Sequence, residues 1–328
     1  MQNYTIFQLL LLGLRKLYLS VTKPKLSLLE CELDSNKAND LIFNALMDDK
    51  PCMITRFGAV EISALNNYVG IVNDKHNVWK FIKGETPEWW WNEGIRFAMK
   101  NNAGFFPTTD QNLLKFGSLM LNCIKSIDIL GSWQPYEHIF LKYFSTAKLV
   151  HIFLLDPFWS KLPWTRALEG KKVLVIHPFA ELIKNQYYER RENLFQNKKI
   201  LPQFDLRVIP AVQSVGGNSE YTDWFQALEY MKEQVDKQDY HICLIGAGAY
   251  GLPLAAYIKN KGKKAVHIGG PLQLLFGIWG KRWNNPHYAS NILNFEGAYL
   301  SMKNSYWVEP SEKLRPVNYQ DIEGGCYW

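Results

Sequence analysis

The chain is organised around residues 241–283, which read HICLIGAGAYGLPLAAYIKNKGKKAVHIGGPLQLLFGIWGKRW. An apolar run over 241–245 is short enough for a buried strand, and a glycine cluster follows it. A helical pattern of apolar residues comes next and ends at basic residues and Gly262, as the carboxyl end of a helix commonly does. A second apolar run over 265–268 ends at two further glycines. This order predicts a β-α-β unit with glycine at both strand exits.

The glycines of this unit favour a phosphate-bearing ligand. Open parallel sheets bind ligands at the carboxyl ends of their strands, and glycine there lets the backbone approach a phosphate. The spacing of Gly246, Gly248 and Gly251 formally matches the dinucleotide fingerprint, which also requires an acid at the end of the second strand. The chain has Gly269 and Gly270 there and no acid, so we expect no NAD. In the alternative reading, the glycines serve only a tight turn and close helix–strand packing.

Composition sets limits on the class of protein. The 328 residues are 47% hydrophobic and can bury a large core, which excludes global disorder. A net charge of +6 suits a small anionic ligand or an anionic membrane surface, and is too small to indicate nucleic acid. The five cysteines are scattered without CxxC spacing, which is typical of a reducing compartment. We therefore expect a cytoplasmic protein with no nucleic-acid partner.

The N-terminal region, residues 5–25, contains an apolar run over 6–14 that is too short to span a bilayer. Basic residues come after this run rather than before it, which is the wrong order for a secretory signal. One interpretation is an amphipathic helix at the inner face of a membrane, with basic side chains beside lipid phosphates. The side chains concerned are Arg15, Lys16, Lys23 and Lys25. The other is a helix docked on the protein body or on a second subunit, and the oligomeric state stays open.

A second strand exit carries charged residues. Residues 51–57 predict a strand that ends at Gly58, and a helix is expected from about Glu61. A guanidinium and a carboxylate at a buried strand exit are unusual. Arg56 and Glu61 either pair with each other, or face a ligand. In the second case Arg56 would meet a phosphate or carboxylate, and Glu61 would act as a metal ligand or general base.

Alternating strand and helix signals over 51–270 predict an α/β fold, a Rossmann-like, mostly parallel sheet with helices on both faces. Further strands are expected at 173–176 and 204–212 and a helix at 118–129, whereas 138–153 gives mixed signals. His177, directly after a strand, is a candidate ligand-binding residue. Aromatic residues between 83 and 110 could stack on sugars or pack a helical layer. The expected organisation is a helical N-terminal appendage (1–50), an α/β domain (51–285) and a wrapping tail (286–328).

Several segments resemble one family. Residues 54–61, ITRFGAVE, resemble the Arg-Phe-Gly-Asp-x-Glu signature of the GT-D-fold glycosyltransferases. Four later segments are similar to a branch of that family found among bacterial capsule and surface-polysaccharide proteins. These segments are 102–107, 177–179, 246–251 and 269–283. The resemblance covers about residues 51–285 and implies a GT-D-like fold.

The resemblance also implies an activity, the transfer of a sugar from a nucleoside-diphosphate donor, typically a UDP-sugar, in surface-polysaccharide biosynthesis. The acceptor would be a saccharide or a lipid-linked saccharide. In the family, the two acids of the signature hold Mn²⁺ or Mg²⁺ on the diphosphate. Here the matching positions are Ala59 and Glu61, so one carboxylate is missing and the remaining shell is thin for a hard cation.

On this basis we assign roles to residues. Glu61 is the expected base or metal ligand, and Arg56 orients it or meets a phosphate. The expected donor-binding residues are Phe57, Gly58, His177, Arg190, Gly246, Gly248, Ala249, Tyr250, Gly251, Gly269, Gly270, Lys281 and Arg282. The expected acceptor contacts are Trp89, Trp90 and Trp91. Two alternatives remain, a non-catalytic nucleotide-sugar-binding or scaffold subunit of a polysaccharide-assembly complex, and an NAD(P)-dependent oxidoreductase.

Overall fold

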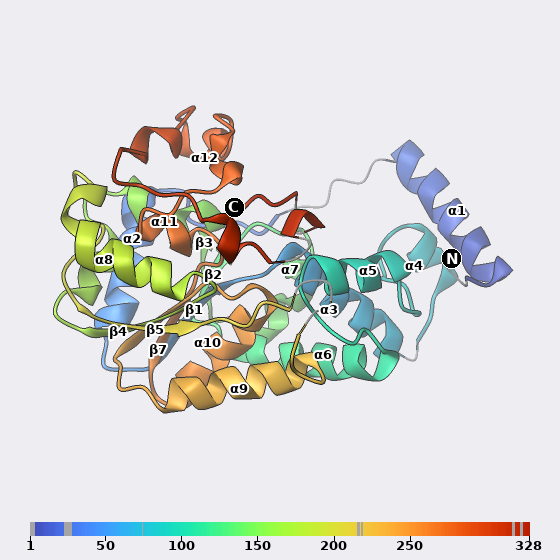
Figure 1. Cartoon of the computed structure of the whole chain (residues 1–328). Coiled ribbons are helices and arrows are strands. Elements are labelled where there is room, and N and C mark those ends of the chain that lie inside the picture. The colour runs from blue at the N-terminus through green and yellow to red at the C-terminus, as the bar shows by residue number, and fades with distance from the viewer. Residues whose placement is uncertain are drawn as a thin grey trace.

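A computed structural model describes residues 4–22, 28–73, 75–214, 217, 219–316, 319–321 and 324–328. Its centre is a seven-stranded sheet in which every pair of neighbouring strands is parallel (Figure 1). The strands are β1 (Cys52–Arg56), β2 (Ile129–Ser132), β3 (Lys148–His151), β4 (Lys172–His177), β5 (Asp205–Pro210), β6 (Ile242–Ile245) and β7 (Lys264–His267). The sheet confirms the expected Rossmann-like α/β fold.

The strand order, β3-β2-β1-β7-β6-β4-β5, places β7 between β1 and β6. Val266 pairs with Ile54 of β1 on one side and with Leu244 of β6 on the other. Because all strands run the same way, the exits of β1, β7, β6 and β4 meet at one edge of the sheet. The two strand exits that the sequence singled out, after β1 and after β6, are therefore separated only by β7.

Helices cover both faces of the sheet. One face carries α3 (Ala59–Val72), α6 (Asp110–Cys123), α9 (Trp224–Asp236) and α10 (Gly251–Asn260). The other carries α2 (Ser35–Met47) and α8 (Ala180–Leu194), with the short helices α11 (Leu272–Leu275) and α12 (Ser290–Leu293). Strand residues alternate between the two cores: Met53 belongs to the first and Ile54 to the second, and both are fully buried. This two-sided burial explains why the strands appear in the sequence as continuous apolar runs.

The two helices in the first fifty residues pack in different places. α2 is capped by Asp34, whose carboxylate accepts hydrogen bonds from the backbone N–H groups of Asn36 and Lys37, and it packs on the sheet through Ala38, Ile42 and Leu46. α1 (Ile6–Thr22) instead packs on α4 (Val78–Ile82) and stands at the end of the molecule away from β5 (Figure 1). No helix among the described residues is long and apolar enough to cross a membrane. Lys23 and Lys25 lie outside the described residues.

The middle of the chain differs from the prediction. The helix expected at 118–129 is α6, which ends at Cys123, and Ile129 already begins β2. The mixed signals over 138–153 are explained by α7 (Glu137–Phe140) followed by β3. β2 and β3 are each preceded closely by helical turns, so their apolar residues continue a helical pattern in the sequence. Between α4 and α6 lies α5 (Glu93–Asn101).

The C-terminal segment forms short turns that pack on the segment after β7. The backbone N–H of Val308 donates to Gly277 O at 2.9 Å, and that of Trp279 donates to Val308 O at 2.7 Å. Gln273 donates from Nε2 to Tyr327 O at 3.2 Å. The last residues therefore lie beside the turn that follows β7.

Candidate functional site

The candidate site begins with Arg56, the last residue of β1. Its Nη1 donates to Phe57 O at 3.0 Å, and its guanidinium carbon lies 5.8 Å from the centroid of the Trp133 ring. Its Nε is buried and has no hydrogen-bond partner among the described residues. A buried donor without an acceptor costs free energy. An added oxygen atom, such as that of a phosphate, would therefore be favourable at Arg56.

Glu61 lies in the first turn of α3, and its carboxyl group folds back over Gly58. A Cβ atom at position 58 would lie 1.9 Å from Glu61 Oε2, so any side chain there would displace the Glu61 carboxyl group. Burial raises the pKa of Glu61, and the nearby charge of Arg56 lowers it in part. Within the described chain no ion pair joins Arg56 to Glu61. The Arg56 charge therefore acts on the Glu61 carboxyl group without a direct ion pair between them.

A second buried acid, Asp156, lies near Arg56. It is only 2% exposed and accepts a hydrogen bond from the hydroxyl of Tyr299 at 2.5 Å. Burial raises its pKa to about 7, while the Tyr299 hydrogen bond and the charge of Arg56 act in the opposite direction. The Tyr288 ring packs against that of Tyr299, with 5.3 Å between ring centroids and a tilt of 60° between the planes. Tail residues thus complete a buried polar cluster around the end of β1.

Arg282 brings a second guanidinium to this region. Its carbon lies 4.5 Å from the centroid of the Tyr327 ring, and its Nη2 donates to Cys326 Sγ at 3.0 Å. The charges of Arg282 and Arg56 both lower the pKa of Tyr327, which burial raises. Tyr327 is therefore close to both arginines and also packs against the turn after β7. A Cβ atom at Gly270 would lie 2.1 Å from Tyr327 Cε1.

The exits of β4, β6 and β7 are held together by histidines and glycines. His177 accepts a hydrogen bond at Nδ1 from the backbone N–H of Phe179 at 3.0 Å, and a Cβ atom at Gly246 would lie 2.6 Å from its ring. His267 shares a 3.0 Å hydrogen bond with Thr55, and a Cβ atom at Gly251 would lie 2.2 Å from its Nε2. Burial lowers the pKa of both histidines to about 3, so both rings are neutral at pH 7.

The glycine cluster after β6 therefore has a packing role that the motif alone does not reveal. Gly246 and Gly251 make room for histidine rings, while Gly248 is exposed and has a φ of 50°, which favours glycine. Gly269 has a φ of 73°, and a Cβ atom there would lie 3.3 Å from Arg56 Nε. The backbone of Gly269 thus forms one wall beside the unpartnered nitrogen. Tight packing and ligand approach are both compatible with these glycines.

Some residues predicted to bind the donor have other partners. The Tyr250 ring stacks on Trp224, with 4.8 Å between centroids, and its hydroxyl bonds Ser214 Oγ at 2.7 Å. Its contact with a base or sugar stays a prediction, and the ring would have to leave this stack to make it. Ala249 and Phe57 are buried in the same core as Tyr250. Their side chains pack in this core, so only their backbone atoms lie at the strand exits.

The outlying basic residues contact the tail. Arg190, on α8, donates from Nη1 to Tyr306 O at 3.3 Å. Lys281 is exposed, with its Nζ 6.0 Å from the centroid of the Tyr319 ring. Of the three basic residues predicted at 190, 281 and 282, only Arg282 has contacts that connect it to the surroundings of Arg56.

The tryptophans predicted to touch an acceptor divide into two groups. Trp89 and Trp90 pack with Phe81 in the small core between α1 and α4. Trp91 is 8% exposed and belongs to the large core that also holds Phe57. These contacts fit the alternative reading, in which the aromatic residues pack a helical layer, and the acceptor contact stays a prediction.

The sequence did not predict the residues that follow β2 as part of the candidate site. Trp133 donates from Nε1 to Phe57 O at 2.9 Å and supports Arg56. Glu137 is fully buried and accepts hydrogen bonds from Ser132 Oγ and from the backbone N–H groups of Trp133 and Gln134. Ser132 and Glu137 would have been candidates if a strand had been predicted before them. The sequence around β2 instead continues a helical pattern, so no strand was expected there.

The residues present do not fit a metal ion held by the protein alone. No group of three or more His, Cys, Asp or Glu side chains suited to a metal is found in the parts of the chain that the structure describes. Ala59, which stands where the resembled signature has its first acid, is exposed at the start of α3. Glu61 alone is a poor site for a hard cation, which requires several oxygen ligands.

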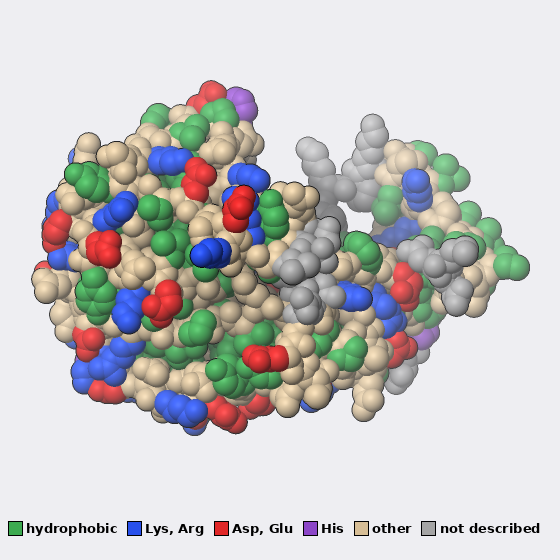
Figure 2. Space-filling model, viewed as in Figure 1, with side chains coloured by type: hydrophobic (Ala, Val, Ile, Leu, Met, Phe, Trp, Pro, Cys, Tyr) green, Lys and Arg blue, Asp and Glu red, His purple; other side chains and the backbone are tan. Residues whose placement is uncertain are grey.

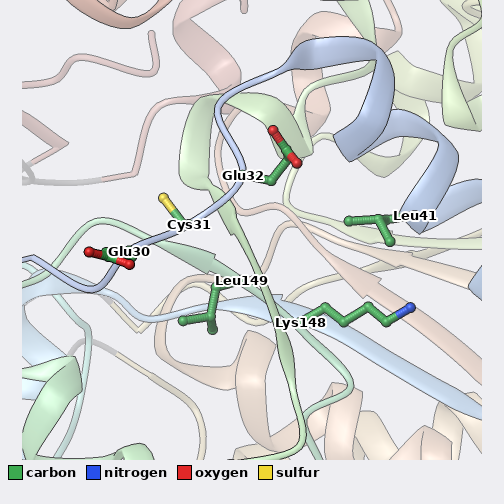
Figure 3. A pocket seen from close by; sticks show the side chains of 6 residues that line it. All are labelled: Glu30, Cys31, Glu32, Leu41, Lys148 and Leu149. Carbon is green, nitrogen blue, oxygen red and sulfur yellow. The ribbon is translucent and has the colours of Figure 1, made fainter.

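Two surface hollows lie away from the strand exits. One, of about 510 Å³, is lined by Glu30, Cys31, Glu32, Leu41, Lys148 and Leu149 (Figure 3). It lies where residues 30–32 run beside β3, the edge strand, and Glu32 N donates to Leu149 O at 2.9 Å. The other, of about 460 Å³, lies at the amino end of β5. Neither hollow contains a predicted site residue.

Comparison with known proteins does not assign the chain to a family. No protein-family model, no curated protein and no solved structure matches the chain.

Proposed function

We propose that this protein is a glycosyltransferase that moves a sugar from a nucleoside-diphosphate donor, of the UDP class, to a saccharide acceptor in surface-polysaccharide biosynthesis. The observation that carries the proposal is the buried, unpartnered Nε of Arg56 at the carboxyl end of a central parallel strand. Ligands of open α/β sheets bind at this edge, and a guanidinium is well suited to phosphate oxygens. Arg282 supplies a second positive charge near the same tyrosine, Tyr327.

The proposed chemistry uses residues at the β1 exit. An acceptor hydroxyl attacks the anomeric carbon of the donor, and the bond from that carbon to the diphosphate oxygen breaks. The nucleoside diphosphate leaves with the bonding electrons, and Arg56 and Arg282 stabilise its developing charge. The hydroxyl proton passes to the carboxylate of Glu61. Burial raises the pKa of this carboxyl group, which makes it a stronger base than an exposed glutamate.

A second candidate function is that of a non-catalytic subunit that binds the nucleotide sugar but does not transfer the sugar. The observation in its favour is Ala59, which stands where the resembled family has its first acid. Such a protein would keep the anion-binding arginines and lose the transfer chemistry. Fold similarity does not distinguish these candidates, because function depends on the site.

The test measures binding and turnover separately in three proteins. We expect UDP to bind the wild type and to raise its melting temperature. Arg56→Ala should weaken UDP binding at least about tenfold, because a charge-assisted hydrogen bond is lost. Glu61→Gln should keep UDP affinity and lower transfer or slow hydrolysis of a UDP-sugar by about 10²- to 10⁴-fold, as loss of a general base does.

Arg207→Ala and Glu181→Gln serve as matched controls, since Arg207 pairs with Asp205 on edge strand β5 and Glu181 is an exposed first-turn acid on α8. Both should behave like the wild type. UDP binding without turnover in the wild type would favour the non-catalytic candidate. Binding of NAD⁺ in place of UDP would assign the glycine cluster to an oxidoreductase, and wild-type turnover by Glu61→Gln would exclude the proposed base.

A further inference from the structure

Half of the surface of α1 is apolar and exposed. At 100° per residue, eight exposed apolar side chains of α1 fall within an arc of about 180°. They are Ile6, Phe7, Leu9, Leu10, Leu14, Leu17, Tyr18 and Val21, which we call the α1 stripe. Their exposed fractions run from 36% at Tyr18 to 87% at Ile6. Soluble proteins rarely leave so continuous an apolar surface in water unless it meets a partner.

The other half of α1 fixes the helix to the protein. Leu11 is 2% exposed and packs on Phe81 of α4. Arg15 lies over the Phe81 ring, 4.6 Å from its centroid, and donates to Thr86 O at 3.2 Å. The hydroxyl of Tyr4 accepts a hydrogen bond from the backbone N–H of Glu93 at 3.2 Å. Because Leu11 and Arg15 lie outside the arc of the α1 stripe, their contacts hold the helix to the protein and leave the stripe exposed.

α1 carries two basic residues, Arg15 and Lys16, and no acidic residue over 6–22. On a helical wheel Lys16 adjoins the stripe beside Leu9, whereas Arg15 lies on the side that packs on α4. In Figure 2 hydrophobic side chains gather at the α1 end of the molecule, where basic and acidic side chains both lie near them. An apolar face bordered by lysine, on a helix without acidic residues, is typical of a helix that lies in a membrane interface.

We propose that the α1 stripe docks this protein on an anionic membrane surface, with the helix axis parallel to the bilayer. The stripe would enter the boundary between headgroups and acyl chains, and Lys16 would reach the headgroup phosphates. A 17-residue helix is about 25 Å long and lies in the interface rather than across the bilayer. A second copy of the chain is a poorer occupant, since its own cations would approach these, whereas anionic headgroups neutralise them. The proposal stands independently of the transferase activity.

The test is co-sedimentation of the full chain with phosphatidylcholine vesicles that contain or lack phosphatidylglycerol. Wild type should bind the anionic vesicles more tightly than the neutral ones. Leu10→Glu combined with Leu17→Glu should lower binding at least about tenfold, because it places two charges in the stripe that would enter the membrane. Lys16→Glu should lower binding to anionic vesicles by about fivefold or more and affect neutral vesicles less.

The matched control is Leu162→Glu combined with Phe295→Glu, which adds the same charges at exposed apolar positions far from α1 in the chain. It should bind like the wild type, and all variants should keep the wild-type melting temperature, since each changed side chain is exposed. Equal vesicle binding by the stripe variant and the wild type, or no binding by either, would overturn the proposal. A wild-type dimer that dissociates in the stripe variant, without vesicle binding, would assign the stripe to a second copy instead. UDP binding is measured without vesicles, so its outcome is separate.

Discussion

Arg56 has two acidic neighbours, Glu61 and Asp156, and burial raises the pKa of both carboxyl groups. With a pKa of about 7, Asp156 carries only part of a negative charge near neutral pH. Less of the Arg56 charge is therefore balanced inside the protein than the residue types alone suggest. The remaining charge is available to a bound anion, which fits the buried Nε that has no partner in the described chain.

Asp156 should make stability depend on pH. Its folded pKa of about 7 lies above the usual value, so the folded state holds a proton that the unfolded chain has lost. The free energy of unfolding therefore falls as pH rises from about 4 to about 7, and becomes level above that. Asp156→Asn removes this dependence, since the amide stays neutral and can still accept from Tyr299.

We expect Asp156→Asn to gain stability relative to the wild type by about 2–3 kcal/mol between about pH 5 and about pH 8. Urea unfolding at both pH values measures the difference. Asp239→Asn is the control, because Asp239 is an exposed partner of Lys172. A stability difference between Asp156→Asn and wild type that stays constant with pH would show that Asp156 is already ionised in the folded state.

The sequence could single out Arg56 and Glu61 as candidate site residues, because both come within a few positions of the end of one apolar run. It could not predict Asp156, whose partner Tyr299 lies 143 residues further along the chain. Only the fold brings such positions together. The same holds for Tyr327, which meets Arg282 and the turn after β7 from the far end of the sequence.

Among the elements, the turn from β6 into α10 shows how one motif supports two interpretations. Gly251 opens α10, and its missing side chain leaves space for the buried ring of His267, which is bonded to Thr55. Gly251→Ala should lower the free energy of unfolding by about 1–3 kcal/mol, because the added methyl group overlaps a ring that cannot move freely. Urea unfolding checks this value.

Gly13→Ala is the control for Gly251→Ala. Position 13 is also helical, but a Cβ atom there would meet nothing within 4 Å. Alanine is the better helix former, so this variant should be as stable as the wild type or slightly more stable. If Gly251→Ala were equally harmless, the packing role of this glycine would be wrong, and a role in ligand approach would gain weight.

Elements separated by glycine were predictable: β6, α10 and β7 lie where the sequence predicts them, although β6 and β7 have only four residues each. β2 is equally short and buried, but only a short 3₁₀ turn separates it from α6, so its apolar residues continued the helical pattern. Its exit, with Trp133 and Glu137, was missed for that reason.

At the scale of the whole molecule, the strand order could not be derived from local patterns. β7 lies between β1 and β6, with Ala265 in the core on one face of the sheet and Val266 in the core on the other. This insertion brings the turn after β7 against Arg56. It also gives the tail its position, since Gly270 and Gly280 both leave room for residues 326–327.

The tail should therefore form one wall of the candidate site, a prediction that rests on the proposed function. Tyr327→Ala removes the ring that packs on Gly270 and under Arg282, and should weaken UDP binding about tenfold, as loss of one charged contact does. Tyr327→Phe should keep UDP affinity, because it retains the ring face that contacts Arg282. Titration calorimetry with UDP measures both.

Tyr306→Ala is the control for this wall, since Tyr306 belongs to the same tail but is 45% exposed. It should bind UDP like the wild type. The melting temperature of Tyr327→Ala should fall, because a large, partly buried ring is lost. Affinity and stability must therefore be compared at a temperature where every variant is folded. If Tyr327→Ala melts lower but binds UDP normally, the tail only covers the sheet, and Arg282 must be held for binding by other contacts or take no part in it.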